Sequence, residues 1–105
     1  VNGEQTLAQN AADLVGIEIA FDALGRAGPV DATARKAFFS AWATAMARTD
    51  RDAALAAAQA GSKFAPAKWR VNGTVANHPE FTKAYACKAG QPLFKAAKDH
   101  VSLLR

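Results

Sequence analysis

The sequence predicts a mainly α-helical fold of four to five helices with one long irregular connection. Apolar residues recur at helical spacing in several stretches, alanine is abundant, and glycine or proline follows these stretches. A chain of 105 residues has room for one domain at most. We expect helices over about 6–24, 32–48, 50–60 and 78–86, with a fifth over 93–104 left open.

The first helix is predicted from an apolar stripe whose members recur every three or four residues: Leu7, Ala11, Leu14, Ile17, Phe21 and Leu24. Thr6 is expected to cap the start of this helix. Gly25, Gly28 and Pro29 are expected to end it and to form a turn.

Capping signals predict the second and third helices. Asp31 stands at an N-cap position ahead of an apolar stripe that includes Phe38. Thr49 and Asp52 resemble a capping box in front of an alanine-rich run, which ends at Gly61. The third helix is therefore expected to be short.

The stretch from Ser62 to Ala76 lacks apolar periodicity and is expected to be the irregular connection, with a turn at Asn72-Gly73. Asn77 and Glu80 form a second candidate capping box ahead of the next helix. Beyond Pro92, several apolar residues and His100 share one stripe, which leaves a final helix open.

Composition places the chain among folded globular proteins, since half of it is hydrophobic and a fifth is charged. Alanine buries little surface, so we expect a thin core of aromatic and larger aliphatic side chains. The net charge of +4 permits contact with nucleic acid, but the basic residues are spread singly, which favours a solvated surface. No window is long and apolar enough to predict a membrane-spanning helix. Because the chain begins at Val1, we expect it to be part of a longer polypeptide.

The residues that usually bind metal are few and scattered. His78 and His100 are the only histidines, and Cys87 is the only cysteine, so no complete zinc site is encoded. We expect His78 to be a surface or capping residue and His100 to be a packing residue. No phosphate-binding loop and no serine-nucleophile motif is present in the sequence.

Two polar features are candidates for a site. Gln9 and Asp13 lie four residues apart, on one face of the first helix. The simple interpretation is a solvent-exposed face of the helix. Ile17 continues the same face, however, so Asp13 is also a candidate for burial. A buried carboxylate needs a partner, and the sequence shows no obvious one. Arg70 lies between apolar residues, which suits either a bidentate bond to a ligand or a structural salt bridge.

Ordered motifs over about residues 1–94 resemble the neprilysin and endothelin-converting-enzyme family of zinc metallopeptidases. Residues 1–16 resemble that family's V-N-G-x-x-T-L-G-E-N-I-A-D-x-G-G segment, and residues 38–43 resemble its F-F-x-x-[FW]-A helix. Residues 69–84 resemble F-R-V-N-G-x-[VL]-x-N-x-P-E-F-x-x-A, and residues 87–90 resemble C-K-P-G. The resemblance implies the C-terminal part of a larger, mostly helical, thermolysin-like catalytic domain.

Position by position, the resemblance implies a substituted active site. The family's third zinc ligand, a glutamate, falls on Gln9, and the histidine that stabilises the transition state falls on Phe64. Asp13 matches the aspartate that orients a metal-binding histidine, and Arg70 matches the arginine that binds a substrate carbonyl. The H-E-x-x-H motif that supplies two ligands is absent from this sequence. The resemblance therefore implies zinc in the family, but this chain alone is expected to bind none and to be inactive.

Three functional interpretations stay open. The first is a degenerate peptidase region that binds peptides or supports the rest of the polypeptide before Val1. The second is part of a zinc endopeptidase that still hydrolyses oligopeptides. The third and most remote is a basic nucleic-acid-binding module, and we expect no nucleic acid. The resemblance also implies an extracytoplasmic location, with Cys87 paired to a cysteine outside this chain. Arg70 and Asp13 are expected to face one cleft. If that cleft binds peptides, Arg70→Ala is expected to weaken the binding by about 1.5 to 3 kcal/mol and to leave the fold largely intact.

Overall fold

A computed structural model describes residues 2–46 and 62–104. Its helices are α1 (Gly3–Ala27), α2 (Ala32–Met46), α4 (Ala67–Val75) and α5 (Pro79–Ala84), and a short 3₁₀ turn, η1, spans Ala97–Asp99. The described part contains no strand, which confirms the mainly α prediction. The helix expected over 50–60 lies outside the described residues, as do the last two residues of the helix expected over 32–48.

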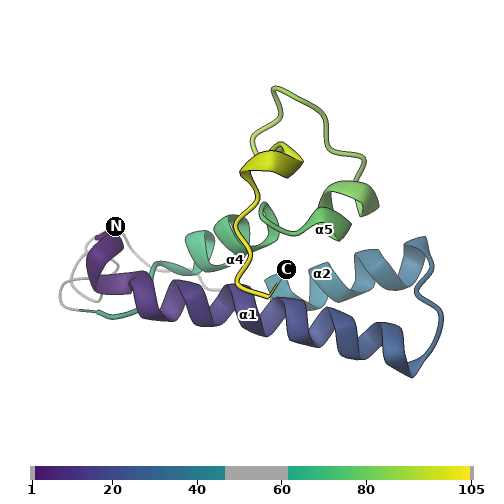
Figure 1. Ribbon diagram of the computed structural model, residues 1–105, viewed down its shortest axis with the longest axis horizontal. Helices are drawn as coiled ribbons and strands as arrows, with labels where there is room; N and C mark the ends of the chain where they lie inside the picture. Colours follow the sequence, from purple (N-terminus) through teal and green to yellow (C-terminus); the bar gives the residue numbers. More distant parts are fainter. Residues whose placement is uncertain (1, 47–61, 105) are drawn as a thin grey trace.

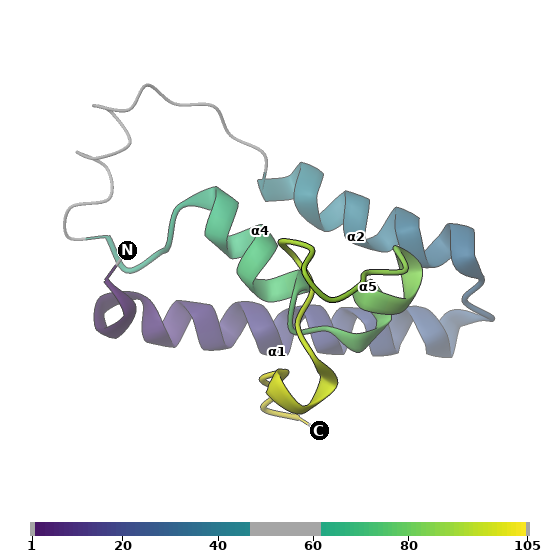
Figure 2. The ribbon, with the colours of Figure 1, turned by 90° about the horizontal axis from the view of Figure 1, so that it is seen from above.

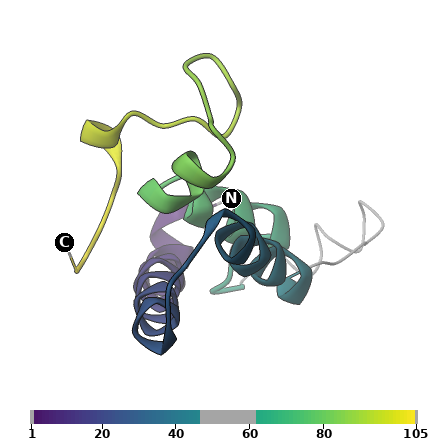
Figure 3. The ribbon, with the colours of Figure 1, turned by 90° about the vertical axis from the view of Figure 1, so that its right-hand side faces the viewer.

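α1 and α2 run side by side in opposite directions, and α4 packs against both of them (Figures 1 and 2). α5 packs against α2, and the C-terminal segment descends beside α1 (Figure 3). None of these helices is long and apolar enough to cross a membrane.

The start of α1 differs from the prediction. Asn2 is the N-cap, because its Oδ1 accepts hydrogen bonds from the backbone N–H groups of Glu4 and Gln5 at 3.1 and 3.2 Å. Thr6 instead lies within the helix and is 1% exposed, and its hydroxyl donates to the Asn2 carbonyl. At the other end the helix continues through Gly25 to Ala27, three residues past the predicted end.

The predicted N-cap of α2 is confirmed. The Oδ1 atom of Asp31 accepts a hydrogen bond from the Ala34 N–H at 2.8 Å. Residues 28–31 form the short connection between α1 and α2, as the glycine and proline signals there predict.

The prediction of a long irregular connection over 62–76 is wrong, because α4 occupies its second half. Pro66 directly precedes α4, and its carbonyl accepts from the N–H groups of Trp69 and Arg70 at 2.8 and 3.1 Å. Asn72-Gly73 lies inside the helix and forms no turn. Contacts of α4 with α1 and α2 outweigh the low helix propensities of its asparagine, glycine and valines.

α5 begins one residue later than its predicted capping box. His78, and not Asn77, is the N-cap, since its Nδ1 accepts from the Glu80 N–H at 3.2 Å. Pro79 occupies the first turn, where its missing N–H costs nothing. His78 thus fulfils the capping expectation but is not a surface residue, because only 5% of it is exposed.

The helix that the sequence left open over 93–104 does not form, apart from the single turn η1. The segment is instead held by Asn77, whose Oδ1 accepts from Lys95 Nζ and from the Val101 N–H, both at 2.8 Å. Ser102 donates its hydroxyl to Glu18 of α1 at 3.0 Å. His100 is half-buried, and one of its ring nitrogens forms a hydrogen bond with the Lys95 carbonyl oxygen at 2.7 Å.

The core is small and largely aromatic. Its buried members come one from each main helix: Ile17, Phe39, Val75 and Phe81. Phe21, Phe38, Trp42, Cys87 and Leu93 pack around them. Phe39 makes edge-on contacts with Phe38 and Phe81 and stacks near Phe21, at centroid separations of 5.1 to 5.8 Å. An ion pair between Arg35 and Glu80, at 2.8 Å, joins α2 to α5 beside this core.

Candidate functional site

Asp13 of α1 and Arg70 of α4 form a bidentate ion pair, although 57 residues separate them in sequence. Arg70 Nε donates to one carboxylate oxygen and Nη2 donates to the other, each at 2.9 Å. The side chain of Asp13 is 9% exposed and that of Arg70 is 25% exposed. Arg70 therefore supplies the partner that the sequence did not reveal for a buried Asp13, and the salt-bridge alternative for Arg70 is correct.

The local folding of both helices explains why the two side chains meet. Thr6, Asp13 and Ile17 are the buried residues of α1 and lie on one stripe of the helix. α4 packs on that stripe, with Arg70 one turn before the buried Thr74. The indole N–H of Trp42 donates to the Arg70 carbonyl at 3.4 Å, which fixes the backbone of α4 against α2.

Arg70 keeps its positive charge in this contact. The hydrogen bond with Asp13 raises the pKa of the Arg70 guanidinium above its ordinary value, which is already high. The guanidinium therefore remains protonated near neutral pH.

Phe64 covers the guanidinium of Arg70. The Cζ atom of Arg70 lies 4.8 Å from the centroid of the Phe64 ring, and Phe64 is 45% exposed. The segment that carries Phe64 is attached to α1, because the side-chain amide of Gln5 donates to the Ser62 carbonyl. The structure thus brings three of the predicted site residues together: Asp13, Arg70 and Phe64.

Gln9 is half-buried and lies one turn before Asp13 on α1. Its side chain is a neutral carboxamide, whereas zinc in proteins is bound by thiolates, imidazoles and carboxylates. Within residues 2–46 and 62–104, no three His, Cys, Asp or Glu side chains are grouped so that they could hold a metal ion. Both oxygens of Asp13 already accept from Arg70. The described residues therefore do not make up a complete set of zinc ligands by themselves.

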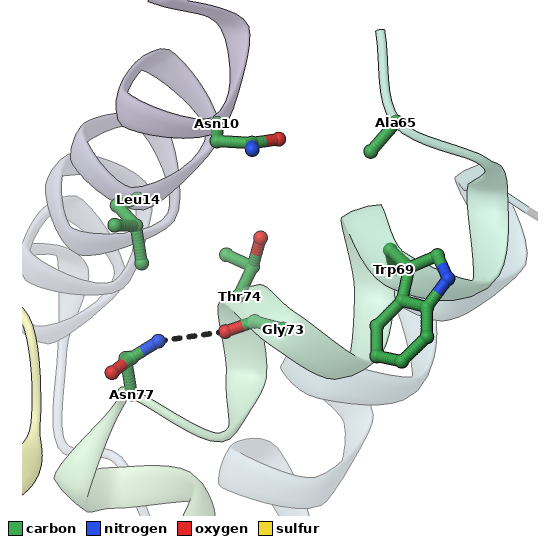
Figure 4. A pocket seen from close by; sticks show the side chains of 7 residues that line it. All are labelled: Asn10, Leu14, Ala65, Trp69, Gly73, Thr74 and Asn77. Atoms are coloured by element: carbon green, nitrogen blue, oxygen red, sulfur yellow. Dashed lines mark hydrogen bonds between the residues drawn. The ribbon is translucent and has the colours of Figure 1, made fainter. Parts of the chain in front are cut away.

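A pocket of about 490 Å³ lies between α1 and α4, apart from the ion pair. Its lining is formed by Asn10, Leu14, Ala65, Trp69, Gly73, Thr74 and Asn77 (Figure 4). Neither Asp13 nor Arg70 lines it, so the cleft expected at these two residues is not this pocket. The sequence did not reveal this pocket, because Trp69 and Gly73 share a face only if the segment is helical, and no helix was predicted there.

The family model for Peptidase family M13 matches residues 1–101 of the chain. Neither the curated proteins nor the solved structures give a match. The family match covers the segments that carry the neprilysin-like motifs and the residues of the ion pair. This chain therefore belongs to peptidase family M13, the family of neprilysin.

Proposed function

We propose that this chain is the C-terminal part of a degenerate M13 peptidase region, which binds peptides at Arg70 without completing a hydrolytic site. The observation that carries this proposal is the assembly of Asp13, Arg70 and Phe64 at one place, with Gln9 one turn away on α1. Asp13 and Arg70 keep the residue types of the family motif, whereas Gln9 and Phe64 do not. The rest of the site, in this proposal, comes from the polypeptide before Val1.

The substituted positions remove contributions to hydrolysis. M13 peptidases are zinc-dependent in general, and a neutral carboxamide at Gln9 neutralises none of the charge of a zinc ion, as a carboxylate would. Phe64 has no N–H group in its side chain to donate to an oxygen on which negative charge develops. The loss of one such donor typically raises the barrier by about 3 to 4 kcal/mol.

The retained pair can still hold a peptide. A guanidinium has five N–H donors, of which Asp13 accepts one from Nε and one from Nη2. The remaining donors can bond a substrate carbonyl, and Arg70 is exposed enough for a ligand to approach. Asp13 keeps the guanidinium in one orientation, which lowers the entropy lost when a peptide binds.

A second candidate is an M13 endopeptidase that still cleaves oligopeptides. The retention of both Asp13 and Arg70 in a well-formed pair favours it. Zinc, supplied by ligands outside this chain, would then provide the Lewis acid. The two candidates differ in whether a bound peptide is converted to products.

The binding proposal can be tested with Arg70→Lys in the intact polypeptide. Lysine keeps the charge beside Asp13 but cannot donate in a fork, so binding of a blocked, fluorescein-labelled oligopeptide should weaken at least tenfold. Arg26→Lys is the matched control, because Arg26 is 82% exposed at the far end of α1. Fluorescence anisotropy measures the affinity, and mass spectrometry of the same samples should find the peptide uncut. Unchanged affinity in Arg70→Lys would rule out the proposed contact, and chelator-sensitive products would favour the second candidate.

We also propose that the protein is extracytoplasmic and that Cys87 pairs with a cysteine outside this chain. Cys87 is half-buried against the core cluster, as a structural disulfide would be. The intact polypeptide, unfolded in urea without reductant, should show no titratable thiol at Cys87, and reduction should release one. A thiol that titrates fully in the unreduced, unfolded protein would contradict this pairing.

A further inference from the structure

We propose that the pocket between α1 and α4 is a second ligand site, which takes an aromatic or branched aliphatic side chain of a peptide that carries carboxylates beside it. This site is distinct from the contact at Arg70, because neither Arg70 nor Asp13 lines the pocket. Its volume of about 490 Å³ is in the range of small-ligand sites, so it can hold one large side chain together with part of the adjoining peptide backbone.

The walls of the pocket are apolar and come from separate elements. Leu14 of α1 and the indole of Trp69 of α4 form opposite sides, and Ala65 closes one end (Figure 4). Trp69 is 53% exposed, although it is the largest side chain of the pocket. An apolar side chain inserted between Leu14 and Trp69 would remove both surfaces from water.

Gly73 lines the pocket without a side chain of its own. It lies inside α4, where glycine is less favourable than alanine, and its backbone does not have the positive φ that would require glycine. A Cβ atom at this position would meet no other atom within 4 Å. A side chain at this position would therefore extend into the pocket that Gly73 lines, without strain in the backbone.

A polar group on one wall suits a peptide backbone. The Nδ2 atom of Asn10 donates to Thr6 Oγ1 at 3.0 Å, which orients the carboxamide, and its side chain points across the pocket toward Ala65 (Figure 4). One N–H and the oxygen of this carboxamide make no other hydrogen bond within the described part of the chain. A peptide unit presents the complementary C=O and N–H groups.

The charge around the pocket favours an acidic ligand. Among the described residues that line it, none is acidic, and Lys95 reaches it from the C-terminal segment, where its Nζ donates to Oδ1 of the lining residue Asn77 at 2.8 Å. Lys68 Nζ lies 5.8 Å from the centroid of the Trp69 ring. Glu18 is an acidic residue of α1, one turn after Leu14, and its carboxylate accepts a hydrogen bond from the Ser102 hydroxyl of the C-terminal segment. Carboxylates beside the inserted side chain would therefore meet the ammonium groups of Lys68 and Lys95.

The test uses the intact polypeptide and a blocked heptapeptide, Gly-Glu-Asp-Phe-Glu-Asp-Gly, labelled with fluorescein. We expect saturable binding in anisotropy measurements, at least a tenfold loss when the central phenylalanine of the probe is alanine, and a several-fold loss in Lys95→Ala. Lys88→Ala is the matched control, because Lys88 is exposed and does not line the pocket. The negative charge beside the inserted side chain could come from acidic side chains or from the C-terminal carboxylate of the peptide. A second probe, which ends in phenylalanine with a free carboxylate, distinguishes these two sources.

Gly73→Leu should place a bulky side chain in the pocket, obstruct it and abolish binding of the heptapeptide while the melting temperature is kept. Gly25→Leu is its control, because Gly25 is also helical and also has open space at its Cβ position. If Gly73→Leu lowers the melting temperature, Gly73→Ala replaces it and should weaken binding without that loss. Unchanged binding in a folded Gly73 variant would overturn the proposal, as would equal binding of a Lys- and Arg-flanked probe. Tighter binding of a fluorescein-labelled oligothymidine, in competition with the heptapeptide, would overturn it in favour of nucleic acid.

Discussion

Replacement of Arg70 by alanine should lower the free energy of unfolding by about 3 kcal/mol, at the lower end of the usual cost of breaking a buried ion pair. The substitution leaves the Asp13 carboxylate, which is 9% exposed, without the donors that satisfy both of its oxygens. Arg70 is a quarter exposed, so water can reach part of the vacated space and limits the cost. Urea unfolding followed by circular dichroism measures the change.

This expectation replaces the prediction from sequence that Arg70→Ala leaves the fold largely intact. The structure shows that Arg70 joins α4 to α1 through Asp13, in line with the salt-bridge alternative for this residue. The double variant Asp13→Leu/Arg70→Met should recover most of the lost stability, because it leaves no unpaired charge. The exposed pair of Asp22 and Arg26 is the control, and Asp22→Ala should cost about 0.5 kcal/mol or less. A loss in Arg70→Ala no larger than in this control would show that the pair does not stabilise the fold.

Replacement of Phe39 by alanine should have a comparable or larger effect, about 3 to 5 kcal/mol. Phe39 is 2% exposed and touches aromatic rings from three directions, so its removal leaves a cavity that a rigid cluster cannot easily fill. Phe64→Ala is the matched control, since Phe64 is 45% exposed and should cost about 1 kcal/mol or less. Thermal unfolding of both variants checks this, and equal shifts in melting temperature would contradict the assignment of Phe39 to the core.

The sequence predicts elements whose signals are local. The apolar stripe of α1 and the N-cap Asp31 of α2 both depend on residues a few positions apart, and both helices form as expected in their described parts. The cap of α1 was placed on Thr6 instead of Asn2, and the capping box of α5 was placed on Asn77 instead of His78, because Thr6 and Asn77 also have side chains suited to capping. An element therefore emerges from the sequence even where its exact first residue does not.

The elements that were mispredicted depend on contacts between distant segments. Residues 67–75 have weak helix propensity, and only packing on α1 and α2 makes this segment helical. The expected helix over 93–104 had a suitable stripe, but Asn77 and Glu18 hold much of that segment in an extended path. No spacing rule brings together residues that are 57 positions apart, so the Asp13–Arg70 pair could be expected only from the family resemblance.

The most direct test of the degenerate site is hydrolysis of a blocked oligopeptide by the intact polypeptide in the presence of zinc, compared between the wild type and Gln9→Ala. Because Gln9 is a neutral carboxamide at the position of a zinc ligand, and Phe64 lacks a donor beside Arg70, we predict bound peptide but no product from either protein. Chelator-sensitive product from the wild type would contradict this interpretation, and its loss in Gln9→Ala would identify Gln9 as a working ligand.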